Sequence, residues 1–394
     1  MKHLKYIMAL SVAALTACQT TPQITPVSSV ASAQSEPLIN ATEVVAVVNT
    51  QVNAVDLEQK AAEWGYSLKK KEKLDGLDMY VMTFDCPPGI NPHEAVVELE
   101  RLQDDSTVSV NHKYSLSLVN STPVAPQPLR RTYADNLIEW PEMGCDARMT
   151  VGIIDGGISD DLLQRHKDQI TYKSFVNGKP SELAVKHGSA IASILTDPKR
   201  LNKGQFYIAS VVSEDDKGQQ FSGLYPMLRA LDWMAKNDVK LVNISLAGPK
   251  NKTLEKAIKR AADKGMIIVA AVGNDGVSAS PRYPAAYDEV IAATAVNKDG
   301  HIYEAAVRGE HVDLSAPGVS IYVPGKDSGR YVSGTSIAAP FVTAMIASHS
   351  QNVDGQTVQD VMANLMGSTQ DLGEDGRDPV YGLGLIKAHK NCAF

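Results

Sequence analysis

The feature that most constrains the fold is a set of short, mostly apolar runs. The clearest are Thr150–Ile154, Leu241–Leu246 and Met266–Val272. The first of these runs lies before the midpoint of the chain, and such runs are typical of parallel strands that are covered on both faces. Helical patterns lie between them, at Leu224–Lys236 and Thr253–Lys264. The alternation predicts an α/β fold with a parallel sheet flanked by helices, in which ligands bind outside the carboxyl ends of the strands.

Two segments rich in small and polar residues divide the rest of the chain. Residues 19–41 and Val119–Arg131 have compositions that cannot bury a core. Between them, strand-like and helical patterns follow the order β-α-β-β-α-β and end in a strand over Val108–Leu118. We therefore expect a small α+β unit of ferredoxin-like plan ahead of the large unit. The expected boundaries are 42–118 for the small unit, 119–136 for a linker and 137–394 for the large unit.

The N-terminus carries an export signal. A positively charged start precedes a short apolar stretch, Tyr6–Leu15, which is too brief to span a bilayer. The stretch runs into Leu15-Thr16-Ala17-Cys18, which resembles the lipobox of bacterial lipoproteins. This resemblance implies a signal peptide over 1–17, a lipid on Cys18 at the head of a tether over 18–41, and a membrane-anchored protein of the bacterial cell envelope. The alternative is an ordinary signal peptide with an incidental cysteine.

Charge and cysteine content narrow the range of partners. The net charge of −7 comes without a basic face, so nucleic acid is not expected as a partner. No Cys/His spacing suits a zinc site, and we expect no cofactor. After Cys18 three cysteines remain, so at most one intramolecular disulfide can form in an oxidising compartment. Because Cys145 and Cys392 flank the large unit, we expect that pair to be bridged. The alternative is three free thiols.

Two polar residues follow or begin regular elements of the large unit. Asp155 closes the run Val151–Ile154 and is followed by two glycines, which allow the chain to turn sharply. His187 begins or adjoins a helical stretch that reaches Leu195. Taken singly, each has a structural interpretation, as a strand-end aspartate and a buried histidine.

A serine and an asparagine complete the set of candidate functional residues. Ser336 lies in Ser333-Gly334-Thr335-Ser336-Ile337-Ala338-Ala339-Pro340. Because Pro340 suits the first turn of a helix, Ser336 is predicted at a helix N-terminus, where backbone N–H groups favour a developing oxyanion. Asn274 follows the run that ends at Val272, and its side-chain amide could donate to an anion. The structural alternatives are an N-cap serine and an asparagine in a turn.

Together these segments resemble the subtilisin-like serine peptidases, the subtilases. The resemblance covers nearly all of residues 137–394. The segments that carry it are Val151–Ile158, His187–Leu195, Val242–Gly248, Val269–Gly276, Tyr283–Ala286 and Ser333–Pro340. It implies a subtilisin-like fold and a triad in which Ser336 attacks, His187 transfers the proton and Asp155 orients the histidine. It also implies an oxyanion hole made by the Asn274 amide and the Ser336 backbone N–H.

The resemblance further implies a cleft for extended polypeptide substrates. Its expected substrate-binding residues are Ser222, Gly223, Ser245, Leu246, Ala247, Gly273 and Arg282. At the far wall of the pocket for the residue before the cut (P1), Arg282 would favour acidic or hydrogen-bonding side chains. The alternative is an arginine that reaches solvent. The sequence departs from the family at Gly156, at Ser189-Ala190 and at Ala247, whose methyl group would narrow the cleft.

By element order and position alone, residues 42–118 resemble a subtilase pro-domain. This implies an intramolecular inhibitor that is cut off within Val119–Arg131, and the alternative is a permanent accessory domain. The sequence thus predicts an exported serine endopeptidase that works through an acyl-enzyme. The alternative function is a catalytically limited, self-processing or peptide-binding envelope lipoprotein.

Overall fold

The fold is taken from a computed structural model, which describes residues 37–116, 119–124, 132–325, 329–348, 355–388 and 392. The predicted signal peptide over 1–17 and the candidate lipidation site Cys18 lie outside the described residues. Among the described residues, no helix combines the length and the apolar character needed to cross a membrane.

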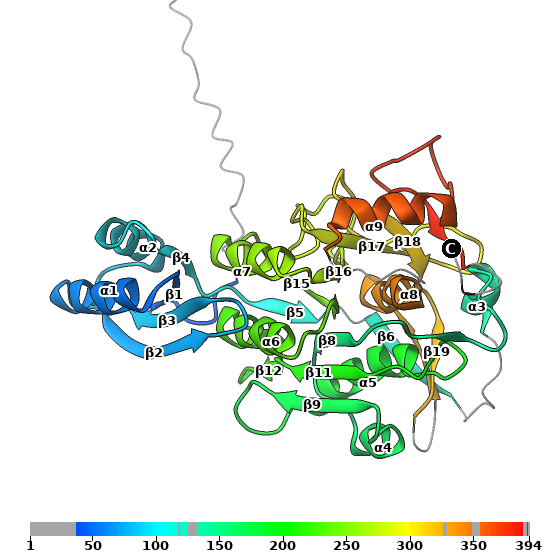
Figure 1. The fold of residues 1–394 in the computed structure, drawn as a ribbon, viewed down its shortest axis with the longest axis horizontal. Helices are drawn as coiled ribbons and strands as arrows, with labels where there is room; N and C mark the ends of the chain where they lie inside the picture. Colours follow the sequence, from blue (N-terminus) through cyan, green and yellow to red (C-terminus); the bar gives the residue numbers. More distant parts are fainter. Residues whose placement is uncertain are drawn as a thin grey trace, which may run out of the picture. The chain divides into compact units, whose positions relative to one another are not determined.

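A nine-stranded sheet forms the centre of the large unit (Figure 1). Its neighbouring strands pair in parallel, except for the antiparallel pair β21–β22 at one end. The order is β21 (Thr369–Gln370), β22 (Leu385–Ile386), β18 (Leu314–Pro317), β17 (Val290–Val296), β16 (Ile267–Ala271), β14 (Leu241–Ile244), β8 (Val151–Asp155), β11 (Phe206–Ser210) and β9 (Ile170–Ser174). The predicted parallel sheet is confirmed, and the three apolar runs form the adjacent strands β16, β14 and β8.

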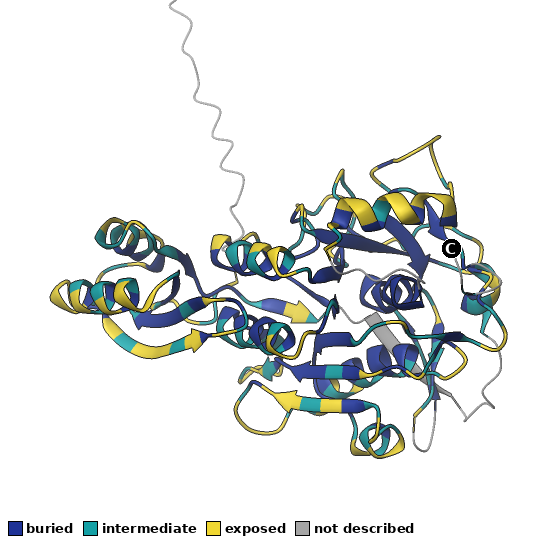
Figure 2. Cartoon of the chain, viewed as in Figure 1, coloured by how far each residue is buried: buried dark blue, intermediate teal, exposed yellow. Residues whose placement is uncertain are grey.

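Helices cover both faces of this sheet, and each face has its own core. On one face, α5 (Glu182–Leu195) and α8 (Thr335–Ser348) share a core with Ile153 of β8. On the other, α6 (Leu224–Lys236) and α7 (Lys252–Asp263) share a core with the next residue, Ile154. Because successive strand residues point to opposite faces, strands covered on both faces are apolar throughout. Figure 2 shows the central strands and α8 as buried.

Shorter elements surround this centre. They are α3 (Tyr133–Leu137), α4 (Asp160–Arg165), α9 (Val358–Leu365), the 3₁₀ turn η1 (Met366–Ser368) and the two-stranded pair β7 (Cys145–Asp146) and β10 (Leu201–Asn202).

The small unit has the predicted β-α-β-β-α-β order. Its elements are β1 (Glu43–Val48), α1 (Gln51–Glu63), β2 (Ser67–Leu74), β3 (Met79–Asp85), α2 (Pro92–Leu102) and β4 (Thr107–Val110). The four strands form an antiparallel sheet in the order β2-β3-β1-β4. One face of the sheet packs on its own helices, with Val44 and Ala46 in that core. The other face, with Val45 and Val47, packs on α6 and α7 and joins the second core of the large unit.

The predicted strand Val108–Leu118 and the predicted linker differ from the structure. The strand stops at Val110, and after a break the chain forms β5 (Tyr114–Leu116), which belongs to a different sheet. That sheet has the order β12 (Ser213–Glu214), β13 (Gln220–Ser222), β5 and β15 (Leu246–Ala247). The expected linker begins with β6 (Val119–Val124), which pairs with β20 (Gly329–Ser333), the neighbour of β19 (Ile321–Val323). Partner strands that are distant in the sequence therefore decide the structure of this region.

The end of the expected linker is also part of the large unit. Asp135 accepts a hydrogen bond from the Thr132 N–H and forms an ion pair of 2.8 Å with Arg200. The Arg200 guanidinium is buried and lies 4.2 Å from the centre of the Phe341 ring in α8. Burial lowers the pKa of Arg200, and the Asp135 carboxylate opposes that shift. Because a buried cation needs its counter-charge, this pair ties α3 to the core.

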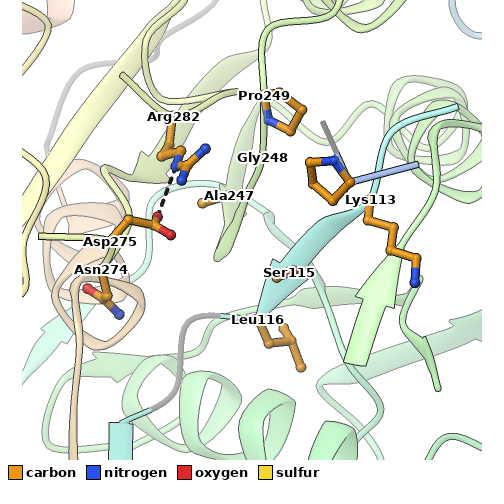
Figure 3. A pocket seen from close by; sticks show the side chains of 10 residues that line it. Lys113, Ser115, Leu116, Ala247, Gly248, Pro249, Asn274, Asp275 and Arg282 are labelled. Carbon is orange, nitrogen blue, oxygen red and sulfur yellow. Dashed lines mark hydrogen bonds and ion pairs between the residues drawn. The ribbon is translucent and has the colours of Figure 1, made fainter. Parts of the chain in front are cut away.

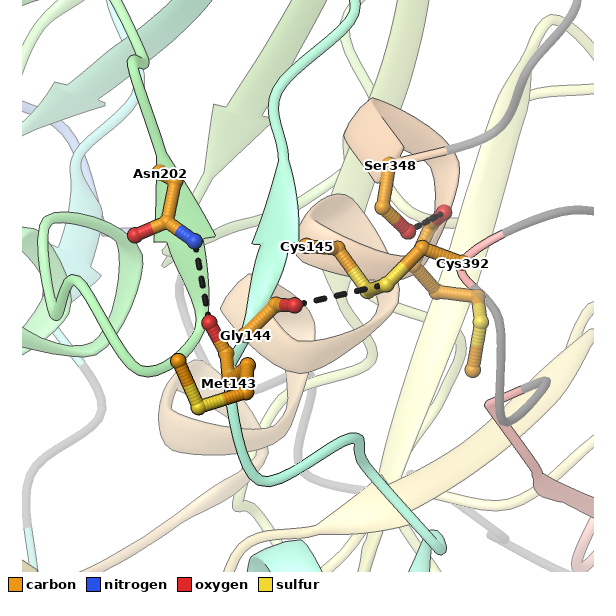
Figure 4. The surroundings of a disulfide bond; sticks show 7 residues. Met143, Gly144, Cys145, Asn202, Ser348 and Cys392 are labelled. Atoms are coloured by element: carbon orange, nitrogen blue, oxygen red, sulfur yellow. Dashed lines mark hydrogen bonds between the residues drawn. A yellow bond between two sulfur atoms is a disulfide. The ribbon is translucent and has the colours of Figure 1, made fainter.

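Cys145 and Cys392 are joined in a disulfide (Figure 4). Their Cα atoms lie 5.5 Å apart, and Cys145 belongs to β7. The third cysteine among the described residues, Cys86 of the small unit, is free and partly buried, and burial raises the pKa of its thiol to about 11. The disulfide ties the C-terminal end of the chain to the start of the large unit.

Candidate active site

The carboxyl end of β8 brings Asp155 to His187 of α5. His187 Nδ1 and Asp155 Oδ1 are 2.6 Å apart, and both side chains are fully buried. The same carboxylate oxygen accepts a hydrogen bond of 2.5 Å from the Gly156 N–H, which orients it. A carboxylate at Nδ1 holds the proton there and leaves Nε2 as an acceptor. Within the described residues, His187 Nε2 is buried without a hydrogen-bond partner.

His187 lies in the second turn of its helix, not at the start. The expectation that the helix begins at or beside His187 is wrong, since α5 begins at Glu182. The Ser181 hydroxyl caps it by accepting a hydrogen bond of 3.2 Å from the Ala184 N–H. The helix therefore carries the imidazole in its rigid interior.

Two glycines allow α5 to approach the end of β8 closely. A Cβ on Gly156 would lie 2.2 Å from the Ala184 carbonyl oxygen, and one on Gly188 would lie 2.3 Å from the Gly157 carbonyl oxygen. Real side chains do not tolerate such contacts, so the backbones could not come this close with larger residues. The departure from the family noted at Gly156 therefore has a packing reason in this chain.

Ser336 lies at the N-terminus of α8, as its motif predicts. It is the second residue of the helix and is buried. The preceding Gly334 has a φ of +151° and donates to the Gly318 carbonyl oxygen at 2.8 Å. α8 packs against α5 on the same face of the sheet, so the helices that carry Ser336 and His187 are neighbours.

Pro340 lies one turn deeper in the helix than the sequence suggested. Because proline has no N–H, it cannot donate to the carbonyl oxygen of Ser336, four residues earlier. The Ser245 hydroxyl donates to that oxygen instead, at 3.3 Å. The Asn243 amide donates to Ser245 Oγ at 2.8 Å, and its carbonyl accepts from Thr343 Oγ1 at 3.1 Å. These fully paired polar groups hold the first turn of α8 against β14.

Asn274 follows β16 and is held by Thr335. Its side-chain oxygen accepts hydrogen bonds from the Thr335 backbone N–H at 3.0 Å and the Thr335 hydroxyl at 2.9 Å. Thr335 Oγ1 in turn accepts from the Gly273 N–H at 3.2 Å. Because both of these donors meet the amide oxygen, Thr335 fixes the orientation of the Asn274 amide beside the start of α8.

The predicted substrate-binding segments flank the chain's own strand β5. Ser222 pairs with Tyr114, and Ala247 pairs with Ser115, both in antiparallel register. Leu246 pairs with Leu116, the last residue of β5. Gly223 lies just beyond the sheet and caps α6. The segment that links the small and large units therefore lies between β13 and β15 as an added strand.

Arg282 lines a cavity of about 280 Å³ beside β5 (Figure 3). Its Nε forms an ion pair of 2.9 Å with Asp275 Oδ2, so the expected cation has a partner. Ala247 and Asn274 also line the cavity. Gly273 has a φ of +98°, and a Cβ there would lie 2.9 Å from Arg282 Cγ. Lys113 also lines the cavity, so its wall carries two cations, of which Arg282 is paired with Asp275 in the wall itself.

Three features of the site were not predicted from the sequence. Asn243 is the polar exception in the apolar run Leu241–Ile244, and that exception could have marked it. Asp275 stands next to Asn274 but gave no sign of pairing with Arg282. The insertion of β5 has no local signal. Among the described residues, no group of three or more His, Cys, Asp or Glu side chains could hold a metal ion.

Comparison with known proteins gives one consistent result. The sequence profile of the subtilase family matches residues 146–384. The chain is 30% identical over 325 residues to the minor extracellular protease Epr of Bacillus subtilis, covering 75% of this chain and 47% of that protein. It is 31% identical over 252 residues to subtilisin DY of Bacillus licheniformis, covering 61% of this chain and 89% of that protein. The match thus spans about half the length of the Epr protease.

Solved structures share the fold. Fervidolysin from Fervidobacterium pennivorans, described as a keratinolytic enzyme related to subtilisin, has a TM-score of 0.68 at 19% identity, covering 90% of this chain and 63% of that one. The epidermin leader peptide processing serine protease from Staphylococcus aureus has a TM-score of 0.62 at 14% identity, covering 89% and 98%. At these identities the likeness concerns the fold alone.

Proposed function

Because the chain belongs to the subtilase family, we propose that it is a serine endopeptidase that cuts polypeptides through an acyl-enzyme on Ser336. The observation that carries the proposal is the buried 2.6 Å hydrogen bond between Asp155 and His187. His187 Nε2 has no hydrogen-bond partner among the described residues, so it is available as a base. The helix that bears it packs against the helix that begins at Thr335 and carries Ser336.

The proposed reaction follows from the properties of these groups. Ser336 Oγ attacks the peptide carbonyl carbon while His187 Nε2 removes the hydroxyl proton. Asp155 keeps the proton on Nδ1 and stabilises the imidazolium as it forms. His187 then protonates the leaving amine, and a water molecule releases the acyl group by the same proton transfers.

Negative charge on the carbonyl oxygen needs donors fixed in advance. The N-terminus of α8 offers the Ser336 backbone N–H, and the Asn274 NH₂ group is oriented by Thr335. Fixed donors in a buried site stabilise an oxyanion without having to reorganise. We expect Asn274→Ala to lower kcat by about 10²–10³-fold, a magnitude taken from subtilisin itself.

Replacement of the nucleophile tests the proposal. Ser336→Ala should lower kcat by about 10⁶-fold, again a magnitude borrowed from subtilisin. Ser348→Ala is the matched control, since Ser348 is a buried serine at the other end of α8 whose hydroxyl donates to the Met345 carbonyl oxygen. Undiminished turnover by purified Ser336→Ala would refute the assignment.

The small unit is proposed to be an inhibitory pro-domain. Support comes from β5, which lies between β13 and β15 as an extended substrate strand would. Because β5 ends at Leu116 and β6 begins at Val119, we place the cut between these residues, earlier than the expected 119–131 segment. N-terminal sequencing of self-cleaved protein should begin at Ser117, Leu118 or Val119. A full chain that keeps the small unit while hydrolysing peptides would favour a permanent accessory domain.

Export and lipidation remain proposals based on the sequence. The N-terminal signal and the Leu15-Thr16-Ala17-Cys18 motif support a lipid anchor on Cys18 in a bacterial cell envelope. Metabolic labelling with a fatty acid should mark the wild type and not Cys18→Ala. Label that survives this substitution would place the lipid elsewhere.

The cavity at Arg282 bears on the choice of P1 residue. Since Asp275 neutralises the guanidinium, we propose a preference for hydrogen-bonding P1 side chains over acidic ones. In a peptide library, Asp275→Ala should shift the preference toward Glu, because it leaves the Arg282 charge without its partner. A preference for large aromatic P1 residues in the wild type would contradict this proposal.

A further inference from the structure

A second strand of the linking segment lies beyond β5, on a different sheet. β6 pairs antiparallel with β20, with Gly329 opposite Val124, Tyr331 opposite Thr122 and Ser333 opposite Val119. β20 is the central strand of the order β19-β20-β6. Without β6, β20 would therefore present an edge of unsatisfied backbone N–H and C=O groups, which is a template for an added strand.

β20 leads directly into the nucleophile. It ends at Ser333, and α8 begins two residues later at Thr335. The other sheet holds β5 up to Leu116. In the uncut chain, the residues before the proposed cut therefore pair with β13 and β15. The residues after the cut pair with β20. β6 lies where the leaving part of a polypeptide substrate would extend.

β20 itself is firmly anchored. Val332 is fully buried, and the Ser320 N–H donates to Ser333 Oγ at 2.9 Å. The Arg330 guanidinium donates to the carbonyl oxygen of Lys186, the residue before His187. The strand edge is thus held in a fixed position relative to the imidazole.

β6 is the weaker partner of this pair. It is an edge strand, its register shifts between Tyr331 and Ser333, and it places Pro123 opposite Arg330. Proline cannot donate to the ladder and is confined to edges for that reason. A strand held in this way can be exchanged for another.

Cleavage between Leu116 and Val119 would have different consequences for β5 and β6. β5 would leave with the small unit, but β6 would stay covalently attached to the large unit as its new N-terminal segment. A tethered segment has an effective concentration in the millimolar range, far above that of most substrates. Release of the small unit would clear β13 and β15 and leave β20 occupied.

We propose that, after self-cleavage, β6 stays on the outer edge of β20 and competes there with the residues of a polypeptide substrate beyond the cut bond. The inference rests on the proposed peptidase function. The favoured substrate would be an extended polypeptide that is long enough to displace β6. In the mature enzyme, β6 would continue to inhibit substrate binding after the small unit has dissociated.

Two fluorogenic substrates with the same residues before the cut bond test this. One carries an aminocoumarin as its leaving group, and the other is an internally quenched peptide with six residues beyond the bond. In self-cleaved enzyme, Asn120→Pro with Thr122→Pro removes two N–H groups of β6. The matched control is Asn120→Ala with Thr122→Ala, which keeps them.

The proline pair should raise kcat/KM for the quenched peptide about tenfold, mainly through KM, and change the coumarin substrate less than twofold. The alanine pair should resemble the wild type on both substrates. Equal effects on both substrates, or no effect on either, would overturn the inference. Failure of the wild type to hydrolyse the coumarin substrate would instead refute the proposed function.

Hydrogen exchange provides a test that needs no variant. In self-cleaved wild-type enzyme freed of the small unit, amide groups of 119–124 should stay protected, because β6 still pairs with β20. Addition of an active-site inhibitor that extends beyond the cut bond should expose the amides of 119–124. Rapid exchange throughout 119–124 in the freed enzyme would contradict a retained strand.

Discussion

The two faces of the large sheet are covered by very different contacts. On one face, α8 is buried along its whole length, and its few polar contacts include those that fix Ser336 and Thr335. On the other face, α6 and α7 lie between the sheet and the small unit, and their outer sides carry polar groups for that unit. Asp232 of α6, for example, accepts hydrogen bonds from the Gly76 and Leu77 backbones at 2.6 and 3.2 Å.

The difference indicates which contact is permanent. The contact with the small unit has an apolar centre, including Val45 and Met79, and a rim of ion pairs such as Lys252–Glu100 and Arg229–Glu72. An apolar centre with a charged rim is the pattern of interfaces between proteins that exist separately. The α8 face resembles a domain interior. The comparison predicts that substitutions on the face covered by α8 lower catalytic activity. Substitutions on the face covered by α6 and α7 should instead weaken inhibition by the small unit.

The largest effect is expected at the close contact between α5 and β8. Gly188→Ala would place a methyl group 2.3 Å from the Gly157 carbonyl oxygen, so the helix must shift and the Asp155–His187 hydrogen bond is lost. We expect kcat to fall about 10⁴-fold, the magnitude seen when the histidine of such a triad loses its carboxylate partner. Ser193→Ala on the same helix should change kcat less than twofold, since Ser193 Oγ donates only to the Ser189 carbonyl oxygen.

A substitution on the opposite face should spare catalysis. Asp232→Ala leaves two backbone N–H groups of the small unit without an acceptor, which costs about 1–3 kcal/mol. The self-cleaved complex should then release its small unit about 10–100-fold faster, measured as the onset of activity after dilution. Asp238→Ala, an exposed carboxylate paired with Lys240, is the control. A fall in kcat on short peptides would show that the two faces are not independent.

A smaller catalytic effect is expected beneath α8. Asn243→Ala removes the donor to Ser245 Oγ and the acceptor for Thr343, while the substrate strands stay in place. We expect kcat to fall about tenfold with KM nearly unchanged, because one such hydrogen bond contributes about 1–1.5 kcal/mol. Thr343→Ser keeps the hydroxyl and should match the wild type. A change confined to KM would assign Asn243 to substrate binding.

The smallest effect concerns pH and the small unit. The pKa of Asp215 is lowered, chiefly by its 2.9 Å hydrogen bond with Lys113 on the other side of the proposed cut. A carboxylate whose pKa is lowered in the complex strengthens binding at pH values above its ordinary pKa, which is near 3.9. That contribution is lost as the pH falls through the lowered pKa. Release of the small unit should therefore quicken a few-fold below about pH 4, and Lys113→Met should flatten this dependence. An unchanged pH profile in that variant would exclude the pair as its source.

The parts of the site that follow local rules were predictable from the sequence. Asp155 ends one apolar strand, Asn274 follows another, and Pro340 indicated a helix that begins near Ser336, although the proline lies one turn deeper than expected. Such signals depend on a few neighbouring residues. The start of α5 was not predicted, because its N-cap, Ser181, lies six residues before His187, outside the motif that marks the histidine.

The path of residues 111–124 could not be predicted in the same way. The alternating pattern of 108–118 suits a single strand, but β5 and β6 take their partners from β15 and β20, far along the chain. Pairing of distant strands is set by the assembled fold, not by local pattern. Asp275 and Arg282 are only seven residues apart, in the connection between β16 and β17, but their pairing depends on how that connection folds beside the cavity.

The most direct test of the central claim is covalent labelling with a fluorophosphonate, followed by peptide mapping. The reagent reports a serine made nucleophilic by a neighbouring base, whatever the natural substrate. We predict a single adduct on Ser336 in the self-cleaved wild type, its loss in His187→Ala and its retention in Ser348→Ala. An adduct on another residue, or equal labelling after His187→Ala, would contradict the assignment of Asp155, His187 and Ser336 as one catalytic unit.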